Sequence, residues 1–226
     1  MVKVEILKAL PIFKNMSEEE LNEIGKIVFL RKFDKNVDIF FEKEMGDAFY
    51  IIVSGLIKIY RSSSDGQIKT LALLHRGDFF GEMALLDEEM RSANARVLET
   101  AEIMVINKLD FMNRIKEKPQ LGMKIMETLS YRIREANKQI EALTFQNVIG
   151  RIAMHLIDLA KEYGKEHPKG ILIDFDLTHQ ELADLVGTAR EIVTKNLNKL
   201  KILKCIEIEE HRVIILNEQG LKELIF

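Results

Sequence analysis

Two stretches of the chain carry residue types whose spacing could do chemistry. The first runs from Gly81 through Arg91 to Ala93, and the second from Thr178 to Lys204. A phosphate cradle needs inward-pointing backbone N–H groups, a glycine that allows close approach, and an arginine that matches the anion's oxygens in bidentate fashion. Gly81 supplies the approach, residues 83–86 supply N–H groups near a helix-like start, and Arg91 supplies the charge.

Glu82 lies inside this first stretch, where an acid beside an anion needs a reason. A carboxylate accepts hydrogen bonds from hydroxyl groups, as it does with a ribose. The combination therefore indicates a site for a ribose phosphate. An ordinary surface turn with a solvated glutamate and a solvated arginine is the alternative that the spacing alone leaves open.

The elements around this stretch are predicted to be short strands. Ser17 and Glu20 form a capping-box pattern for one early helix, and turn residues then separate apolar and aromatic runs. Many short strands at such spacing indicate a β-barrel or sandwich, with Asp65-Gly66 as a type I′ hairpin tip. The expected strands are Val37–Phe41, Ala48–Val53, Leu56–Tyr60, Lys69–Leu74, Ala95–Val97 and Ile103–Ile106.

A long helix is predicted over residues 121–145, which contain no proline and no glycine after Gly122. Apolar residues recur there at alternating spacings of three and four, the a/d pattern of a coiled coil. A stripe that merely covered a barrel would usually be wider, so we expect a homodimer seam. The flanking charged residues, Arg132 among them, are expected to form a solvated face. The seam residues are Met126, Leu129, Ile133, Ala136, Ile140 and Leu143.

The second stretch has the pattern of a helix-turn-helix. Thr178 and Glu181 form a capping box, Gly187 supplies the tight turn, and a second helix is predicted from Thr188 to Leu200. Its apolar set is Ile192, Val193, Leu197 and Leu200. Residues 206–208 and 213–215, on either side of Glu210-His211-Arg212, read as a β-hairpin wing. A generic pair of antiparallel helices is the alternative.

The second helix carries the chemistry for reading DNA bases. Arginine pairs in bidentate fashion with guanine, and glutamate accepts a hydrogen bond from cytosine. Arg190 and Glu191 stand at the helix start, with Lys195 one turn further. We expect phosphate positioning from Thr178, His179, Thr188 and Thr194.

Composition bounds the remaining possibilities. The 226 residues exceed the usual size of one domain. The net charge is −3, yet residues 188–204 hold five basic residues and one acid, so positive charge is concentrated there. No apolar run is long enough to span a bilayer and no signal peptide is evident, so we expect a cytoplasmic protein without membrane contact. A single cysteine, Cys205, excludes an internal disulfide and an iron–sulfur cluster. The five histidines show no ligand spacing, so no metal is expected.

Residues 81–93, which we call the cassette, closely resemble the phosphate-binding cassette of cyclic-nucleotide-binding domains. Gly46-Asp47-Ala48-Phe49-Tyr50-Ile51 and Val53-Ser54-Gly55 also resemble early strands of that domain. The resemblance implies that Glu82 contacts the ribose 2′-hydroxyl and that Arg91 and Ser92 contact the phosphate. The backbone at Gly81, Met83 and Ala84 completes the implied site. We expect Arg91→Ala to abolish nucleotide binding and to leave the fold intact.

The whole chain resembles the cyclic-AMP receptor protein and fumarate-nitrate regulator (CRP/FNR) superfamily. The resemblance implies an α+β chain: an N-terminal jelly-roll-like β-barrel sensor over residues 1–115, a long dimerisation helix over 116–145, and a C-terminal winged helix-turn-helix over 146–226. Ala136 and Asn137 stand where the cyclic-AMP receptor protein contacts adenine, and Ala136 offers no side-chain hydrogen bond. Asn137 is therefore the one base-contact candidate, and cyclic AMP is one candidate among cyclic nucleotides.

The expected function is allosteric regulation of transcription, and no residue set indicates an enzyme. The expected partners are a second copy of the chain, double-stranded DNA with a two-fold-symmetric operator and, as the resemblance implies, RNA polymerase. The alternative is a constitutive DNA-binding dimer whose barrel binds no nucleotide, or binds a different small anion. No cofactor is required by either interpretation.

Overall fold

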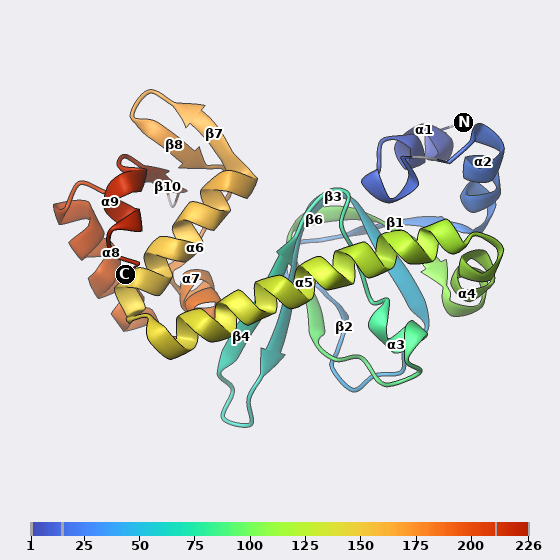
Figure 1. Cartoon of the computed structure of the whole chain (residues 1–226), viewed down its shortest axis with the longest axis horizontal. Helices are drawn as coiled ribbons and strands as arrows, with labels where there is room; N and C mark the ends of the chain where they lie inside the picture. Colours follow the sequence, from blue (N-terminus) through green and yellow to red (C-terminus); the bar gives the residue numbers. More distant parts are fainter. Residues whose placement is uncertain (1, 15, 211, 226) are drawn as a thin grey trace. The chain divides into compact units, whose positions relative to one another are not determined.

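The computed structural model describes residues 2–14, 16–210 and 212–225. Contacts between residues divide the chain into two compact units (Figure 1). The first unit comprises Met1–Arg61 and Leu71–Ile133, and the second comprises Ser62–Thr70 and Arg134–Phe226. The domain boundaries expected at residues 115 and 145 stay a prediction.

The first unit is built on a six-stranded sheet in which paired strands follow the order β1-β6-β3-β4. Strand β2 pairs with β6 and β5 pairs with β3, both antiparallel. The strands are β1 (Phe29–Phe33), β2 (Asp38–Phe40), β3 (Ala48–Ser62), β4 (Ile68–Leu74), β5 (Phe79–Phe80) and β6 (Asn94–Asn107). The helices are α1 (Val2–Lys8), α2 (Glu18–Ile27), α3 (Met83–Leu86) and α4 (Lys108–Glu117), with a 3-10 turn at Pro11–Phe13.

Strand β3 begins as an uninterrupted apolar run because both faces of the sheet are covered there. On one face Phe49 and Ile51 join a core with α1, α2 and α4, and Phe49 stacks on Phe111 with ring centroids 4.3 Å apart. On the other face Tyr50 and Ile52 pack against β5 and β6. The cassette therefore follows directly from a strand, β5, that is buried on both sides.

Two pairs of predicted strands are each one long strand in the structure. Residues 48–53 and 56–60 belong to β3, and residues 95–97 and 103–106 belong to β6. The sequence predicted a break at Ser54-Gly55, where the structure has a register shift. Gly55 has a φ of +90°, and a Cβ there would lie 2.6 Å from the Thr100 carbonyl oxygen. The glycine thus allows an irregular pairing to continue rather than ending the strand.

The tip between β3 and β4 is not the predicted type I′ turn. A type I′ turn needs positive φ at both central residues, and here only Gly66 has one, at +83°. The Gly66 N–H donates to the Ser63 carbonyl at 3.1 Å, and the Ser63 N–H donates to the Gln67 carbonyl at 2.9 Å. The tip is a three-residue loop that ends in a left-handed glycine.

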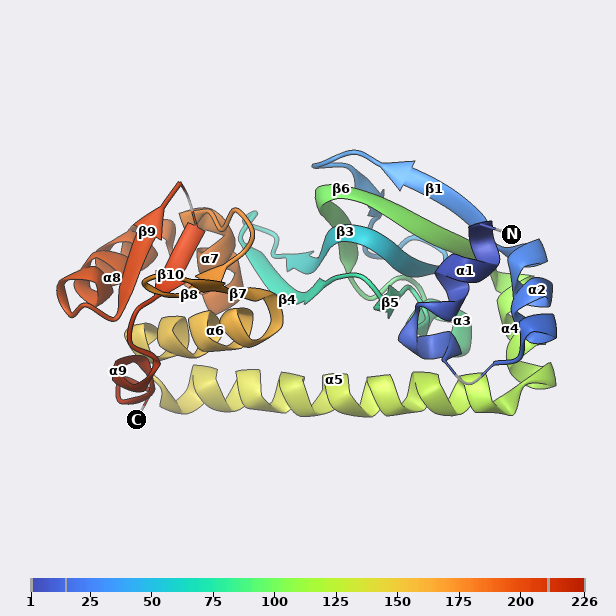
Figure 2. The ribbon, with the colours of Figure 1, turned by 90° about the horizontal axis from the view of Figure 1, so that it is seen from above.

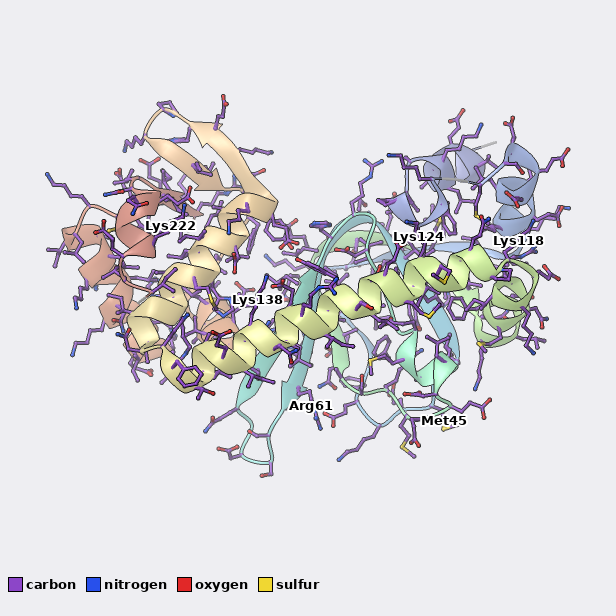
Figure 3. All side chains as sticks on the ribbon, in the orientation of Figure 1. Met45, Arg61, Lys118, Lys124, Lys138 and Lys222 are labelled. Atoms are coloured by element: carbon purple, nitrogen blue, oxygen red, sulfur yellow. The ribbon has the colours of Figure 1, made fainter. Side chains whose placement is uncertain are left out.

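Helix α5 (Pro119–Phe145) confirms the predicted long helix and begins two residues earlier (Figure 1). Leu121 and Ile125 are buried in the first unit's core. Figure 3 labels Lys124 and Lys138 on this helix, and each pairs with an acid three positions away, Glu127 at 2.7 Å and Glu135 at 2.6 Å. These pairs belong to the solvated flanks that the sequence predicted.

The second unit contains the helix-turn-helix and a small sheet (Figure 2). Its sheet has four strands in the order β7-β8-β10-β9, so the predicted wing of β9 and β10 is confirmed but β7 and β8 were missed. The helices are α6 (Val148–Tyr163), α7 (His179–Val186), α8 (Arg190–Ile202) and α9 (Glu218–Lys222). The strands are β7 (Gly164–His167), β8 (Gly170–Ile173), β9 (Ile206–Glu209) and β10 (Arg212–Ile215).

The expected α+β class is confirmed by these two units. His211, in the predicted wing turn, lies outside the described residues. Within the described ranges, no helix has both the length and the apolar character that a membrane crossing requires.

His155 on α6 makes the second unit sensitive to acid. Burial, together with the nearby cations Lys69 and Arg151, lowers its pKa from 6.5 to about 4. A base whose pKa is lower in the folded state stabilises the fold above pH 6.5, and this contribution is lost as the pH falls toward 4. We expect His155→Gln to flatten the fall in urea midpoint between pH 7 and pH 4.5. An equal fall in both proteins would contradict the burial of a neutral His155.

Candidate functional site

The cassette begins where β5 ends, and its glycine is required by the close packing there. Gly81 has a φ of +80°, and a Cβ would lie 2.7 Å from Nη1 of Arg91 and 3.0 Å from the ring of Tyr50. Gly46, in the turn before β3, packs equally closely, because a Cβ there would lie 2.6 Å from the Cβ of Ala84. Helix α3 therefore lies directly against the segment that precedes β3.

Arg91 is buried at the centre of the cassette, with 3% of its surface exposed. Nη1 donates to the Gly81 carbonyl at 2.7 Å, and Nη2 donates to the Ala48 carbonyl at 2.9 Å. The guanidinium lies 4.3 Å from the centroid of the Phe40 ring. Its Nε is buried and has no hydrogen-bond partner. A buried donor without an acceptor is uncommon and calls for an explanation.

Glu82 is also buried, with 2% of its surface exposed, and its partner comes from α5. Nη1 of Arg132 donates to Oε1 of Glu82 at 2.9 Å, and Nη2 of Arg132 donates to the Phe79 carbonyl. Burial raises the pKa of the Glu82 carboxyl, and the attraction of Arg132 opposes that rise. The ion pair ties the cassette to the long helix.

Arg132 is the residue of the candidate site that the sequence analysis missed. It was placed on a solvated face of the helix, and the structure shows this to be wrong, since its guanidinium bonds Glu82 and the Phe79 carbonyl. One signal could have found it. A buried carboxylate such as Glu82 needs a nearby cation. Arg132 is a cation on the long helix that follows the sheet, next to the seam residue Ile133.

The rest of the cassette is more open. Met83 and Ser92 are exposed, with the Ser92 Oγ 3.6 Å from the Met83 sulfur, whereas Ala84 is buried. Met45, labelled in Figure 3, is 74% exposed and pairs by its backbone with Met90. The first N–H groups of α3 have no acceptor within the helix. Asn137 is exposed on α5 in the second unit and stays a predicted effector contact.

The predicted seam residues on α5 are exposed, with one exception. Met126, Ile133, Ile140 and Leu143 are 53%, 63%, 61% and 48% exposed, and Ala136 is exposed as well. Leu129 instead packs against the first unit's core. The exposed apolar residues nevertheless follow the predicted spacing along one helix.

The helix-turn-helix has the predicted caps. Thr178 and Glu181 form a complete capping box on α7, and Gly187 ends the helix in the left-handed conformation with a φ of +74°. His179 Nδ1 lies 2.8 Å from Thr194 Oγ1, which itself donates to the Arg190 carbonyl at 3.0 Å. Of the residues expected to position phosphates, Thr178 thus caps α7, whereas His179 and Thr194 join α7 to α8.

Helix α8 begins at Arg190, two residues later than predicted. Its N-cap is Ala189, which makes no side-chain cap, so the first N–H groups of the helix are left for another acceptor. Arg190, Glu191 and Lys195 are exposed, and Thr188 is half-buried. The buried set is Val193, Leu197 and Leu200, whereas Ile192 is 42% exposed instead of packed.

The structure offers no metal site within the described residues, where no group of three or more His, Cys, Asp and Glu could hold an ion. His75 lies 3.1 Å from Asp78, and His167 lies 4.0 Å from Glu209, each as a separate pair.

The burial of Arg91 changes one expectation from the sequence. Because the side chain bonds two backbone carbonyls, we expect Arg91→Ala to destabilise the fold by about 2 to 4 kcal/mol rather than leave it intact. Denaturant unfolding would measure the loss. Arg61→Ala is the control, since Arg61 (Figure 3) is exposed and pairs with Glu42 at the surface, an interaction that contributes up to about 1 kcal/mol. Equal losses for the two variants would contradict this assignment.

Comparisons with known proteins agree with this arrangement. Residues 30–118 match the family described as "Cyclic nucleotide-binding domain", and residues 150–224 match the "Crp-like helix-turn-helix domain". The chain is 33% identical to the "Cyclic AMP receptor protein" of Thermus thermophilus over 194 residues, a match that covers 86% of this chain and 87% of that protein. It is also 33% identical to the "Anaerobic regulatory protein" of Bacillus subtilis, over 96% of this chain and 92% of that protein.

A solved structure supports the same conclusion. A CRP/FNR-family transcriptional regulator from Thermus thermophilus matches with a TM-score of 0.74 and 28% identity, over 87% of this chain and 98% of that chain. The chain therefore belongs to the CRP/FNR family of DNA-binding transcriptional regulators, with a cyclic-nucleotide-binding domain and a Crp-like helix-turn-helix.

Proposed function

We propose that this regulator acts as a homodimer whose DNA binding is gated by a small anionic effector at the cassette. The observation that carries the proposal is the orphaned Nε of Arg91, a buried donor inside a phosphate-cradle sequence. A phosphate oxygen would give this donor an acceptor. Helix α8, whose first residues are exposed, would carry out the DNA binding.

The effector we favour is a ribose phosphate, with cyclic nucleotides as the first candidates. Oε1 of Glu82 accepts from Arg132, and a carboxylate has room to accept from a ribose hydroxyl as well. Contacts with the base have less support, because Ala136 has no hydrogen-bonding side chain and Asn137 is the one base-contact candidate. The relatives' names also differ, one naming cyclic AMP and one naming anaerobic regulation, so we leave the base open.

The dimer is proposed from the exposed apolar stripe on α5. Met126, Ile133 and Ile140 lie seven residues apart, which is the repeat of a two-helix seam. A second copy of the chain presents the same stripe and would cover these side chains. The resulting two-fold symmetry would place two α8 helices on one operator.

The operator contacts follow from the exposed start of α8. Arg190 and Glu191 would read base edges, Lys195 would donate as a point charge, and Thr188 would contact phosphate. The uncapped N–H groups after Ala189 suit a phosphate of the backbone. We place the protein in the cytoplasm, with DNA and RNA polymerase as partners.

A second candidate function is a constitutive DNA-binding dimer. It is favoured by the two backbone carbonyls that already bond Arg91, since they satisfy part of the guanidinium without any ligand. In that case the cassette is a structural element, and nucleotides would neither bind nor change DNA affinity.

Native mass spectrometry with cyclic AMP, cyclic GMP and cyclic di-GMP tests both the dimer and the effector. We expect a dimer that binds up to one cyclic nucleotide per chain, and loss of that mass shift in Arg91→Ala. Arg61→Ala should bind as the unchanged chain does, because Arg61 is exposed and pairs with Glu42, outside the cassette. A monomer would refute the dimer, and a dimer that takes up none of the three nucleotides would favour the constitutive alternative.

Selection of bound sites from random DNA tests the recognition helix. We expect an enriched motif with dyad symmetry and half-sites one helical turn apart, with guanine where Arg190 docks. Arg190→Ala should lose about 1 to 3 kcal/mol of discrimination at one position of each half-site. Equal weakening on all sequences would instead make Arg190 a phosphate contact, and a motif without symmetry would refute the two-fold arrangement.

A further inference from the structure

The carboxyl end of α7 is held by two cations of the second unit. The N–H groups of Gly187 and Thr188 both donate to the Ala183 carbonyl, at 2.9 and 3.1 Å. The carbonyls of Leu185 and Val186 therefore have no donor within the helix. Lys69 Nζ donates to the Leu185 carbonyl, and Arg151 Nε donates to the Val186 carbonyl at 3.3 Å.

Lys69 reaches this position from the hairpin of residues 62–70, which belongs to the second unit. Its stem packs beside the turn, because a Cβ at Gly187 would lie 3.9 Å from Lys69 Cδ. Partly burying a cation at this position costs free energy. Burial, together with the nearby charge of Arg151, lowers the pKa of Lys69 to about 8, and Asp184 opposes the shift.

A lysine usually extends its ammonium group into water, which costs less than burying it. Here the charge is turned toward the negative end of a helix dipole, where Nζ donates to the Leu185 carbonyl. The turn at Gly187 leads directly into α8, which begins at Arg190. Whatever fixes the carboxyl end of α7 therefore helps to set the position of the recognition helix.

We propose that Lys69 is a positioning residue for DNA recognition, which holds the carboxyl end of α7 through the Leu185 carbonyl without touching DNA. The inference rests on the proposed recognition role of α8. The hairpin that carries Lys69 continues through β4 and β5 into the cassette, so the same stretch of chain contains both the effector residues and the α7 contact.

Lys69→Met in the full chain tests the proposal, since methionine keeps an apolar stem and removes the charge and the donor. We expect affinity for the selected operator to fall about two- to tenfold, the range of a partly buried cation at a helix end. Affinity for a non-specific duplex and the salt dependence of operator binding should not change. Lys69→Arg, which keeps a cationic donor, should recover part of the loss.

Lys161→Met is the matched control, because Lys161 is an exposed lysine of the same unit that pairs with Asp158 at 3.2 Å. It should bind the operator as the unchanged chain does. Two outcomes overturn the proposal: operator affinity that Lys69→Met leaves unchanged, or a salt slope reduced by about one, which would make Lys69 a phosphate contact.

Hydrogen exchange separates this inference from the proposed function. In Lys69→Met, the amides of Gly187 and Thr188 should exchange about two- to tenfold faster, whereas those of α9 should not change. If the unchanged chain selects no operator, the proposed function fails while exchange still reports whether Lys69 holds α7. Unchanged exchange at Gly187 and Thr188 would overturn the inference in either case.

Discussion

The burial of Arg91 is the interaction on which the cassette depends. Removing a guanidinium from water costs several kcal/mol unless its donors find acceptors. The chain meets this cost with the carbonyls of Gly81 and Ala48, with the Asp47 carboxylate 3.3 Å from Nη2, and with the face of the Phe40 ring. Gly81 must then be a glycine, because any Cβ would meet Arg91 Nη1 at 2.7 Å.

Glu82 is a second buried charge that needs a partner, and its partner lies on the long helix. Its buried carboxylate is compensated by Arg132, so the effector residues and α5 share one ion pair. In the proposed mechanism, an effector that bonds Arg91 and Glu82 changes the partners of both charges. Its effect on DNA binding can be no larger than its differential affinity for the two arrangements of the protein. Arg132 is the residue through which α5 would respond.

Local signals in the sequence predicted much of this. The capping boxes at Ser17 and Thr178 and the turn at Gly187 were predicted correctly, because each depends on a few neighbouring residues. The hairpin tip was wrong, since Asp65-Gly66 suits more than one loop length and the strand register decides between them. Strands β7 and β8 were missed because each is short and depends on a partner, β8 on the distant strand β10 and β7 on β8.

The site was predictable in its residue types but not in its partners. Glu82 and Arg91 were predicted as site residues from their types and from the family resemblance, whereas Arg132 was not, because the ion pair joins residues fifty positions apart. The sequence also gave no sign that Arg91 supports the fold as well as the expected phosphate contact. The contacts with the Gly81 and Ala48 carbonyls show that role.

The most direct test of the account is the operator affinity of the full chain, measured by fluorescence anisotropy with and without saturating cyclic nucleotide. Coupling between two sites typically amounts to about 1 to 3 kcal/mol. The account predicts that one ribose phosphate shifts the operator dissociation constant at least about fivefold, and that DNA shifts nucleotide affinity by the same factor. An operator affinity that no cyclic nucleotide alters would contradict it.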